Sequence, residues 1–505
     1  MPDPRMERTV RAVEAALMRA AHRYRPKVQV RVEGRVVTVR DGVLAIEDLP
    51  DARIEQLLEI DRSRALVLGL GEHVQAVALD GAVEAGQTVR LGSARLAIPV
   101  SDGLIGRVVD PLGRPLDGQP LALASSSEPI DRPAPQIYER AAVHMPLFTG
   151  ILAIDAMLPI GRGQRELVLG DEGTGKTSLV VDAILRQRDT GVVSVYVAIG
   201  RRRAEVWRIA DELRRGAGRW IIVAAPEDAP PAMRYLAAYA GTAVAEHFMR
   251  RGEHALVVYD DLSAHAVAWR ELSLLMRRPP GREAYPGDVF YLHARLLERA
   301  AQLSSELGGG SLTALPVASL EGGRLTGYVP TNLISITDGQ IVLSQQLFAA
   351  GQRPAIDVGL SVSRVGAKAQ VAAMRALAGP LKLDYATFLE LEIFARMGTR
   401  LDATTSSKIE RGRRLRALLG ARRASPLSVV DEVVRLVIAA HPALTRIPEE
   451  ACGAFAADIA AMVRRDQSAA ATRIERDGVF PKSDRDGLDE LVAATVARRF
   501  PEPPK

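Results

Sequence analysis

The sequence has one cysteine and no long apolar run. Cys452 alone cannot form an internal disulfide, and such sparse cysteine is typical of a reducing compartment. A membrane-spanning helix needs about 18 or more consecutive apolar residues, and no stretch of the sequence supplies them. The amino-terminal residues also lack the apolar segment of a secretory signal peptide. We therefore expect a protein that is soluble or peripheral to a membrane.

The chain also lacks a strong excess of charge of one sign. Its 66 Lys and Arg residues and 61 Asp and Glu residues leave a net charge of +5, and the arginines are scattered along the whole sequence. Surfaces that bind single-stranded nucleic acid combine basic with aromatic side chains, and aromatic residues make up only 4% of this chain. The sequence therefore predicts no nucleic-acid partner.

Periodic patterns divide the 505 residues into several predicted domains, because a single core stops growing at roughly 250–300 residues. Residues 1–25 have the apolar spacing of one amphipathic helix. From Val28 apolar residues alternate with polar ones, and a turn at 40–42 separates two short strands. This pattern predicts a β-barrel over residues 26–93.

Beyond the predicted barrel the pattern changes twice. Apolar strands alternate with helical stretches over residues 94–371, which predicts a mostly parallel sheet with helices on both faces. Residues 372–505 are helical in pattern, and the valines at 430, 433, 434 and 437 share one face. We expect this last segment to form a helical bundle.

A glycine-rich segment between an apolar strand and a helix carries the clearest chemical signal. Gly170 is followed, after four residues, by Gly175, Lys176 and Thr177. This is the spacing of a P-loop, whose backbone N–H groups surround phosphates at a helix N-terminus. Lys176 is expected to reach the β- and γ-phosphates, and Thr177 to hold Mg²⁺. The segment predicts nucleotide binding.

A second apolar strand ends in Asp260 and Asp261. A buried strand that delivers a carboxylate beside a P-loop is typical of a Walker B motif, in which the carboxylate supports Mg²⁺. Thr177 and Asp260 are therefore the predicted metal residues. The predicted nucleotide-binding residues are Gly170, Asp171, Glu172, Gly173, Thr174, Gly175, Lys176, Thr177 and Asp260. The expected fold class is multidomain: an N-terminal β-barrel, a central α/β P-loop (RecA-like) nucleotide-binding domain, and a C-terminal α-helical bundle.

Longer segments resemble the alpha subunit of F-type ATP synthases. The similarity includes residues 159–165, 257–263, 277–293 and 327–340, and its most specific part is 358–366. It extends over roughly residues 26–420 and weakens at both ends. Motifs of this length in this order are not expected by chance.

This resemblance implies a three-domain subunit that alternates with catalytic beta subunits in a ring of six, around a gamma shaft and beside stator subunits. It implies binding of ATP or ADP with Mg²⁺ without turnover, in a complex that couples ATP synthesis or hydrolysis to proton or sodium transport. That complex is peripheral, on the cytoplasmic side of the cell membrane. Arg364 matches the family's arginine that reaches into the neighbouring catalytic site, and Ser361 lies in the same motif. We predict both as catalytic contributors.

One position separates nucleotide binding from hydrolysis. The catalytic relatives implied by the resemblance carry a Glu directly after the glycine that ends the strand following the P-loop. Here that position is Arg201, and a cation cannot serve as a base for the attacking water. Glu205 lies four residues further on, in the wrong place of the motif. The sequence therefore predicts a subunit that binds nucleotide but does not hydrolyse it.

The chain departs from the family pattern in its nucleotide region. Alpha subunits usually have Arg-Gln where this loop has Glu172 and Gly173, and Gln where Arg201 stands. Ala421 and Arg423 stand where two glutamines commonly contact adenine. The amino-terminal segment differs as well. These departures indicate a divergent branch of the family, and the alternate, sodium-translocating enzymes are the branch we expect. They leave the strength of nucleotide binding open.

Three alternatives remain on sequence alone. A self-sufficient hexameric ATPase, such as the export ATPases of secretion systems, shares the barrel and core, but a Glu at position 201 would favour it. An RNA-dependent motor similar to the Rho terminator would need RNA-contact motifs in the barrel. A ring subunit that has lost nucleotide binding would fit the altered adenine region.

Overall fold

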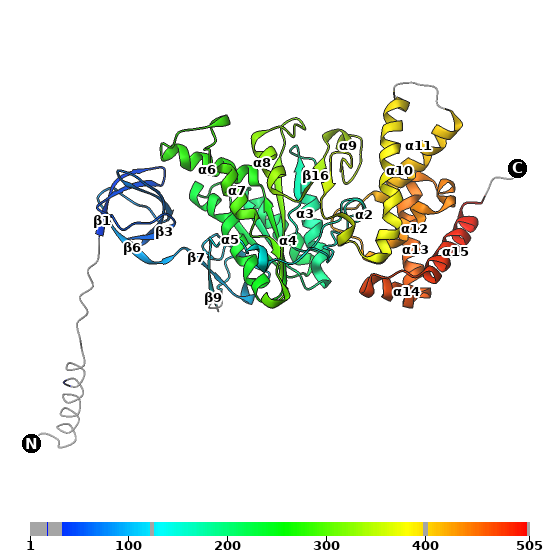
Figure 1. Cartoon of the computed structure of the whole chain (residues 1–505), viewed down its shortest axis with the longest axis horizontal. Helices are drawn as coiled ribbons and strands as arrows, with labels where there is room; N and C mark the ends of the chain where they lie inside the picture. The colour runs from blue at the N-terminus through cyan, green and yellow to red at the C-terminus, as the bar shows by residue number, and fades with distance from the viewer. Residues whose placement is uncertain (1–17, 19–32, 122–125, 397–401, 502–505) are drawn as a thin grey trace, which may run out of the picture. The chain divides into compact units, whose positions relative to one another are not determined.

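The computed structural model describes residues 18, 33–121, 126–396 and 402–501 (Figure 1). The helix predicted over residues 1–25 lies outside these residues, apart from Met18. The chain forms two compact units. One contains residues up to Arg40 together with Leu44–Ser93, and the other contains Asp41–Val43 together with the chain from Ala94 onward.

The first unit contains the predicted barrel. Its strands close in the order β1-β2-β5-β4-β3-β6. Asp41 and Gly42 connect the first two strands with φ angles of 45° and 80°, as a two-residue hairpin loop requires. The six strands are β1 (Glu33–Arg40), β2 (Val43–Glu47), β3 (Gln56–Ile60), β4 (Ser63–Leu70), β5 (Val74–Asp80) and β6 (Thr88–Arg95). Alternate side chains of these strands, such as Leu58 and Ile60, fill the interior and confirm the barrel.

A mostly parallel sheet forms the centre of the second unit. Its order is β17-β16-β10-β15-β13-β11-β12-β8, and β14 pairs with β15 outside this path. The strands are β8 (Val108–Val109), β10 (Leu167–Gly170), β11 (Val193–Ile199), β12 (Trp220–Ala225), β13 (His254–Asp260), β14 (Ala301–Gln302), β15 (Ser311–Ser319), β16 (Gly339–Leu343) and β17 (Val362–Ser363). A separate pair joins β7 (Ala97–Val100) to β9 (Ser126–Pro129). The P-loop strand β10 therefore lies inside the sheet.

Helices cover both faces of this sheet. Every residue of β11 and β12 is buried, as expected for parallel strands enclosed by helices. The helices are α2 (Leu152–Met157), α3 (Lys176–Arg186), α4 (Arg203–Gly216), α5 (Pro231–Arg250), α6 (Leu262–Leu275), α7 (Val289–Leu297), α8 (Tyr328–Ile336) and α9 (Gln345–Ala349). The predicted α/β domain is confirmed.

The remaining chain is helical, as predicted. Its helices are α10 (Ala372–Arg396), α11 (Ala403–Leu419), α12 (Val429–Ala440), α13 (Cys452–Asp466), α14 (Ser468–Thr472) and α15 (Lys482–Arg499). Ser428 and Asp431 form a capping box at the start of α12, and the four valines predicted to share one face are all buried. The expected fold class is thereby confirmed from barrel to bundle.

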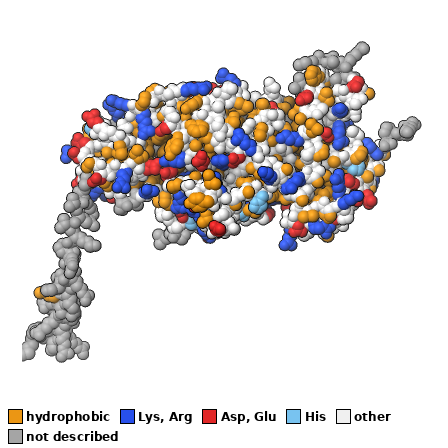
Figure 2. Space-filling model, viewed as in Figure 1, with side chains coloured by type: hydrophobic (Ala, Val, Ile, Leu, Met, Phe, Trp, Pro, Cys, Tyr) orange, Lys and Arg blue, Asp and Glu red, His pale blue; other side chains and the backbone are white. Residues whose placement is uncertain are grey.

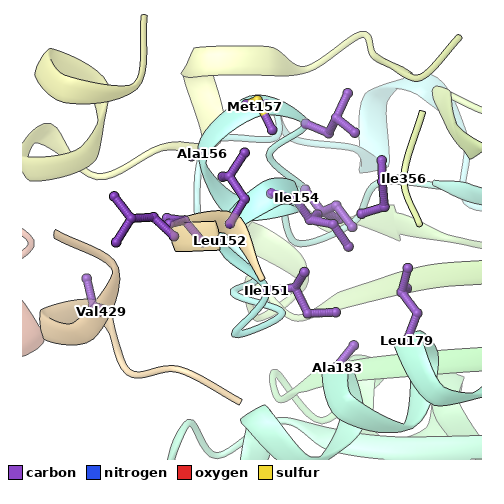
Figure 3. Close-up of a cluster of buried hydrophobic side chains, with 14 of the residues drawn as sticks. Ile151, Leu152, Ile154, Ala156, Met157, Leu179, Ala183, Ile356 and Val429 are labelled. Carbon is purple, nitrogen blue, oxygen red and sulfur yellow. The ribbon is translucent and has the colours of Figure 1, made fainter. Parts of the chain in front are cut away.

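The helical region and the sheet region share one hydrophobic core. Figure 3 shows Leu152 of α2, and Ile151 directly before that helix, between Leu179 of α3 and Val429 of α12. Because residues from Ala94 onward belong to one compact unit, the boundary expected near residue 371 stays a prediction.

The surface carries charges of both signs. Figure 2 shows Lys and Arg side chains interspersed with Asp and Glu over the face in view. Among the helices of the described residues, none combines the length and the apolarity needed to cross a membrane.

Candidate nucleotide-binding site

The P-loop connects β10 to α3. Gly173 and Gly175 have φ angles of 78° and 100°, a conformation that glycine adopts without the strain a side chain would add. No other atom lies within 4 Å of the place where a Cβ would stand on either glycine. Gly175 caps α3 without a side-chain hydrogen bond, so the N–H groups of its first turn are left for a ligand.

Lys176 begins α3 and lies buried against the loop. Its Nζ donates hydrogen bonds to the carbonyl oxygens of Gly170, at 2.7 Å, and Asp171, at 2.9 Å. Burial lowers the pKa of Lys176, and the carboxylate of Asp261 opposes this shift. The ammonium group is thus held inside the loop, where phosphate oxygens would replace the carbonyl oxygens as acceptors.

Side chains on either side of Lys176 complete the loop. The Thr174 hydroxyl donates to the Asp171 carbonyl oxygen at 2.7 Å, and the Asp171 carboxylate accepts from the N–H of Gly323 at 3.0 Å. Glu172 is exposed. Within the described part of the chain, the hydroxyl of Thr177 has no hydrogen-bond partner, which leaves its oxygen free for a metal ion.

Asp260 lies at the end of β13 and is fully buried. Its two carboxylate oxygens are both engaged: one accepts from the Tyr196 hydroxyl and the other from the Arg201 guanidinium. The next residue, Asp261, caps α6 by accepting from the N–H of Ser263 at 2.6 Å. The Walker B carboxylate therefore has a resident cation beside it.

Arg201 owes its position to the pairing of β11 with β13. The two strands align Ala198 with Asp260, so a residue three positions after Ala198 reaches the end of β13. Burial opposes the charge on Arg201, but the Asp260 carboxylate outweighs it and raises the pKa of Arg201 above its ordinary value. Position 201 thus holds a permanent cation, and Glu205 lies in the first turn of α4.

The predicted catalytic contributors lie at another edge of the sheet. Arg364 is exposed just after β17, and its backbone N–H donates to the Asp338 carbonyl oxygen at 2.9 Å. Ser361 is buried; its hydroxyl donates to the Asp357 carbonyl oxygen at 2.5 Å and accepts from the N–H of Val342 at 2.9 Å. The Ser361 hydroxyl therefore fixes the backbone that precedes Arg364.

Glu166 is a further residue near Arg364 that the sequence analysis left unassigned. It is fully buried, and its Oε2 accepts from the Gln164 amide at 2.7 Å, whereas its Oε1 has no hydrogen-bond partner in the described chain. Burial raises the pKa of Glu166, and the nearby positive charge of Arg364 opposes the shift. A carboxylate directly before an otherwise apolar strand was the available sequence signal.

The segment expected to contact adenine has its own partners. Arg423 forms a salt bridge of 2.7 Å with Glu212 of α4. The Ala421 N–H donates to the Arg353 carbonyl oxygen at 2.9 Å, and the Arg353 guanidinium lies 3.4 Å from the centre of the Phe348 ring. Arg423 is therefore paired with a residue of α4, and Ala421 lies beside Arg353, whose guanidinium stacks on Phe348.

Comparison with known proteins agrees with this geometry. The nucleotide-binding domain of the ATP synthase alpha/beta family matches residues 150–363, and the C-terminal domain of the ATP synthase alpha/beta chain matches residues 370–495. Together they cover the P-loop, Asp260, Ser361 and the helical region, and Arg364 directly follows the first match.

Whole-chain similarity points the same way. The chain is 50% identical over 467 residues to ATP synthase subunit alpha 3 of Paraburkholderia xenovorans (strain LB400), covering 91% of this chain and 87% of that protein. It is 49% identical over 461 residues to ATP synthase subunit alpha 2 of Cereibacter sphaeroides, covering 90% and 93%. ATP synthase subunit alpha 2 of Burkholderia thailandensis is 56% identical over 410 residues, covering 80% and 74%. This chain belongs to the ATP synthase alpha/beta family.

Proposed function

We propose that this chain is the non-catalytic, nucleotide-binding alpha subunit of a rotary ATP synthase. The observation that carries the proposal is the ion pair of Arg201 with Asp260 beside a complete P-loop. The loop supplies phosphate binding, whereas the position of the water-activating base holds a cation. The chain therefore keeps the chemistry of binding and lacks that of hydrolysis.

Nucleotide binding rests on the residues of the loop. The N–H groups at the start of α3 and the Lys176 ammonium group present positive charge to phosphates. ATP or ADP is the expected ligand. Glu172 is exposed, and its carboxylate adds repulsion that reduces affinity without blocking the loop.

The residues present also fit Mg²⁺ bound together with the nucleotide. Mg²⁺ keeps several waters and takes one or two protein ligands besides phosphate oxygens. The free hydroxyl of Thr177 is the direct candidate, and Asp260 is the acidic residue behind it. Because Arg201 and Tyr196 already engage Asp260, we expect it to act through water.

This chain contributes to turnover through Arg364, whose side chain reaches into the catalytic site of the neighbouring subunit. Its side chain is exposed, and the described chain forms no salt bridge with it. The Arg364 N–H is held by the Asp338 carbonyl oxygen, and the Ser361 hydroxyl stabilises the backbone that precedes Arg364. An arginine supplied in this way stabilises charge on the transferring phosphoryl group and contributes about 10³–10⁵-fold in rate.

The partners follow from the same proposal. Beta subunits alternate with this chain in a ring of six around the gamma shaft, and stator subunits hold the ring. The complex is peripheral to the cell membrane on its cytoplasmic side and couples ATP synthesis or hydrolysis to proton or sodium transport. The similarity to alpha subunits along most of the chain, together with Arg201, disfavours a self-sufficient export ATPase.

ATPase activity of the purified chain, alone and mixed with its beta and gamma subunits, tests this function. We expect activity only in the mixture, with a loss of about 10³-fold or more for Arg364→Ala. Lys368→Ala, an exposed cation four residues away, is the matched control and should keep activity. Turnover by the isolated chain would refute the proposal and favour the export-ATPase alternative.

A further inference from the structure

A second basic site lies at the opposite end of α3 from the P-loop. It is a cavity of about 1180 Å³ between the end of α3, one face of α4, the segment before α12, and the π-helical turn η9 (Arg473–Asp477). We call it the arginine cavity. An α-helix rises about 1.5 Å per residue, so the 11 residues of α3 separate it from the P-loop by roughly 16 Å.

Positive charge dominates the lining of this cavity. The three acidic residues that line it are Asp189, Glu212 and Glu475, and the arginines are Arg162, Arg186, Arg188, Arg208, Arg215, Arg423 and Arg476. Glu212 pairs with Arg423 at 2.7 Å, Glu475 with Arg186 at 3.4 Å, and Asp189 with Arg188 at 3.8 Å. Each carboxylate is thus already matched by one arginine.

The remaining four arginines have no carboxylate partner in the described chain. They come from segments far apart in the sequence: Arg162 precedes β10, Arg208 and Arg215 lie on α4, and Arg476 lies in η9. Arg162 and Arg215 donate hydrogen bonds to backbone carbonyl oxygens, those of Pro146 and Asp211. Arg208, Arg215 and Arg476 are exposed, so their guanidinium groups are accessible to a bound anion without the loss of an ion pair.

One wall of the cavity is apolar. Phe148, Leu185 and Leu427 line it, and the Arg186 guanidinium lies 5.9 Å from the centre of the Phe148 ring. Arg186 Nε is buried without a hydrogen-bond partner in the described chain. Since the C-terminus of α3 carries partial negative charge, the guanidinium groups must supply the attraction for an anion here.

We propose that the arginine cavity binds a compact anion that carries several phosphate groups. Guanidinium groups bind phosphate oxygens through paired hydrogen bonds, and an oligophosphate concentrates charge within the volume of the cavity. An acidic peptide spreads one charge per residue along about 3.3 Å of chain and suits an extended groove instead. This site is separate from the P-loop and does not depend on the proposed subunit function.

Binding of inorganic tripolyphosphate to the full chain tests the proposal. The measurement uses isothermal titration calorimetry on chain carrying Lys176→Gln, so that the P-loop does not contribute. Arg208→Gln with Arg215→Gln removes two unpaired arginines of the cavity. Arg202→Gln with Arg214→Gln is the matched control, because both residues are exposed at the same helix and neither lines the cavity.

We expect saturable binding with one tripolyphosphate per chain, weakened about tenfold or more by the cavity pair and unchanged by the control pair. Thermal melting monitored by circular dichroism should show that both double variants fold alike in the absence of ligand. Tripolyphosphate should then raise the melting temperature of the control double variant and not that of the cavity double variant. Three results would each overturn the proposal: no saturable binding, equal weakening by both pairs, or equally tight binding of a polyglutamate peptide.

Discussion

At the scale of single residues, Arg201 limits what the site can do chemically. An acidic residue in this place would stand beside Asp260 and polarise water. The guanidinium instead neutralises Asp260 and stays charged, since Asp260 raises its pKa. Arg201 thus supplies no base and engages the Asp260 carboxylate at the same time.

The ion pair is also a prediction about stability. Arg201→Ala leaves Asp260 buried and without its cation. Breaking a fully buried pair costs about 3–5 kcal/mol; because the Arg201 side chain is 27% exposed, we expect about 2–3 kcal/mol. The urea midpoint of unfolding measures it. Arg203→Ala removes an exposed pair with Asp228 and should leave the midpoint unchanged, and an equally small shift for Arg201→Ala would contradict the argument.

Sequence reasoning reached only part of this site. The loop between β10 and α3 and the strand that ends in Asp260 were predictable, because each motif is contiguous in the sequence. The roles of their residues in nucleotide binding stay predictions. That Arg201 contacts Asp260 was not predictable, because it requires knowing that β11 and β13 are neighbours with Ala198 opposite Asp260. Glu166 was missed for the same reason, since its relation to Arg364 depends on the pairing of β10 with β16 and of β16 with β17.

At the scale of elements, local signals explain the parts of the fold that the sequence predicted well. Asp41 and Gly42 accept positive φ angles, so the first hairpin of the barrel is visible as a turn between alternating strands. The helical spacing of the valines in α12 predicts the face of the helix that is buried. Two-residue strands such as β8 and β17 have no periodicity to detect and exist only through pairing with distant strands.

The contact between α2 and α12 includes two buried carboxyl groups. Asp155 and Glu432 lie within the core that joins the sheet to the helical region. Burial raises the pKa of both, and in Glu432 the neighbouring Asp155 raises it further. The folded chain therefore holds protons on this pair more tightly than the unfolded chain does.

This pair predicts how stability depends on pH. A carboxyl group whose folded pKa is raised contributes stability below its unfolded value of about 4.3 and loses it as pH rises toward the folded value. Glu432→Gln removes that loss, so the variant should gain stability relative to the parent at pH 8 and gain less at pH 5. Urea midpoints at both values measure it. Glu410→Gln, a change at an exposed residue of α11, is the control and should shift the midpoint equally at pH 5 and pH 8. An equal shift at both pH values for Glu432→Gln would contradict the prediction, because it would mean that the Glu432 carboxyl group does not titrate between pH 5 and pH 8.

At the scale of the whole molecule, the predicted nucleotide site and the proposed anion site lie in one of the two compact units. The P-loop, Asp260, Arg364 and the arginine cavity all belong to the unit that contains the chain from Ala94 onward. The cavity is lined by residues from 148 to 476, so no local pattern in the sequence predicts it. Its charge is visible only after the fold has brought these arginines together.

This division predicts where nucleotide protects the chain. A ligand that binds only the folded state slows the opening of the structure that contains its site. With Mg-ATP, hydrogen exchange should slow in the P-loop and the first turn of α3, and remain unchanged in the barrel strands β1 to β6, which carry no predicted nucleotide residue. Mass spectrometry of peptic fragments measures both regions in one sample. Lys176→Gln should abolish the protection in α3, whereas equal slowing of the barrel would mean that the two units respond to nucleotide as one.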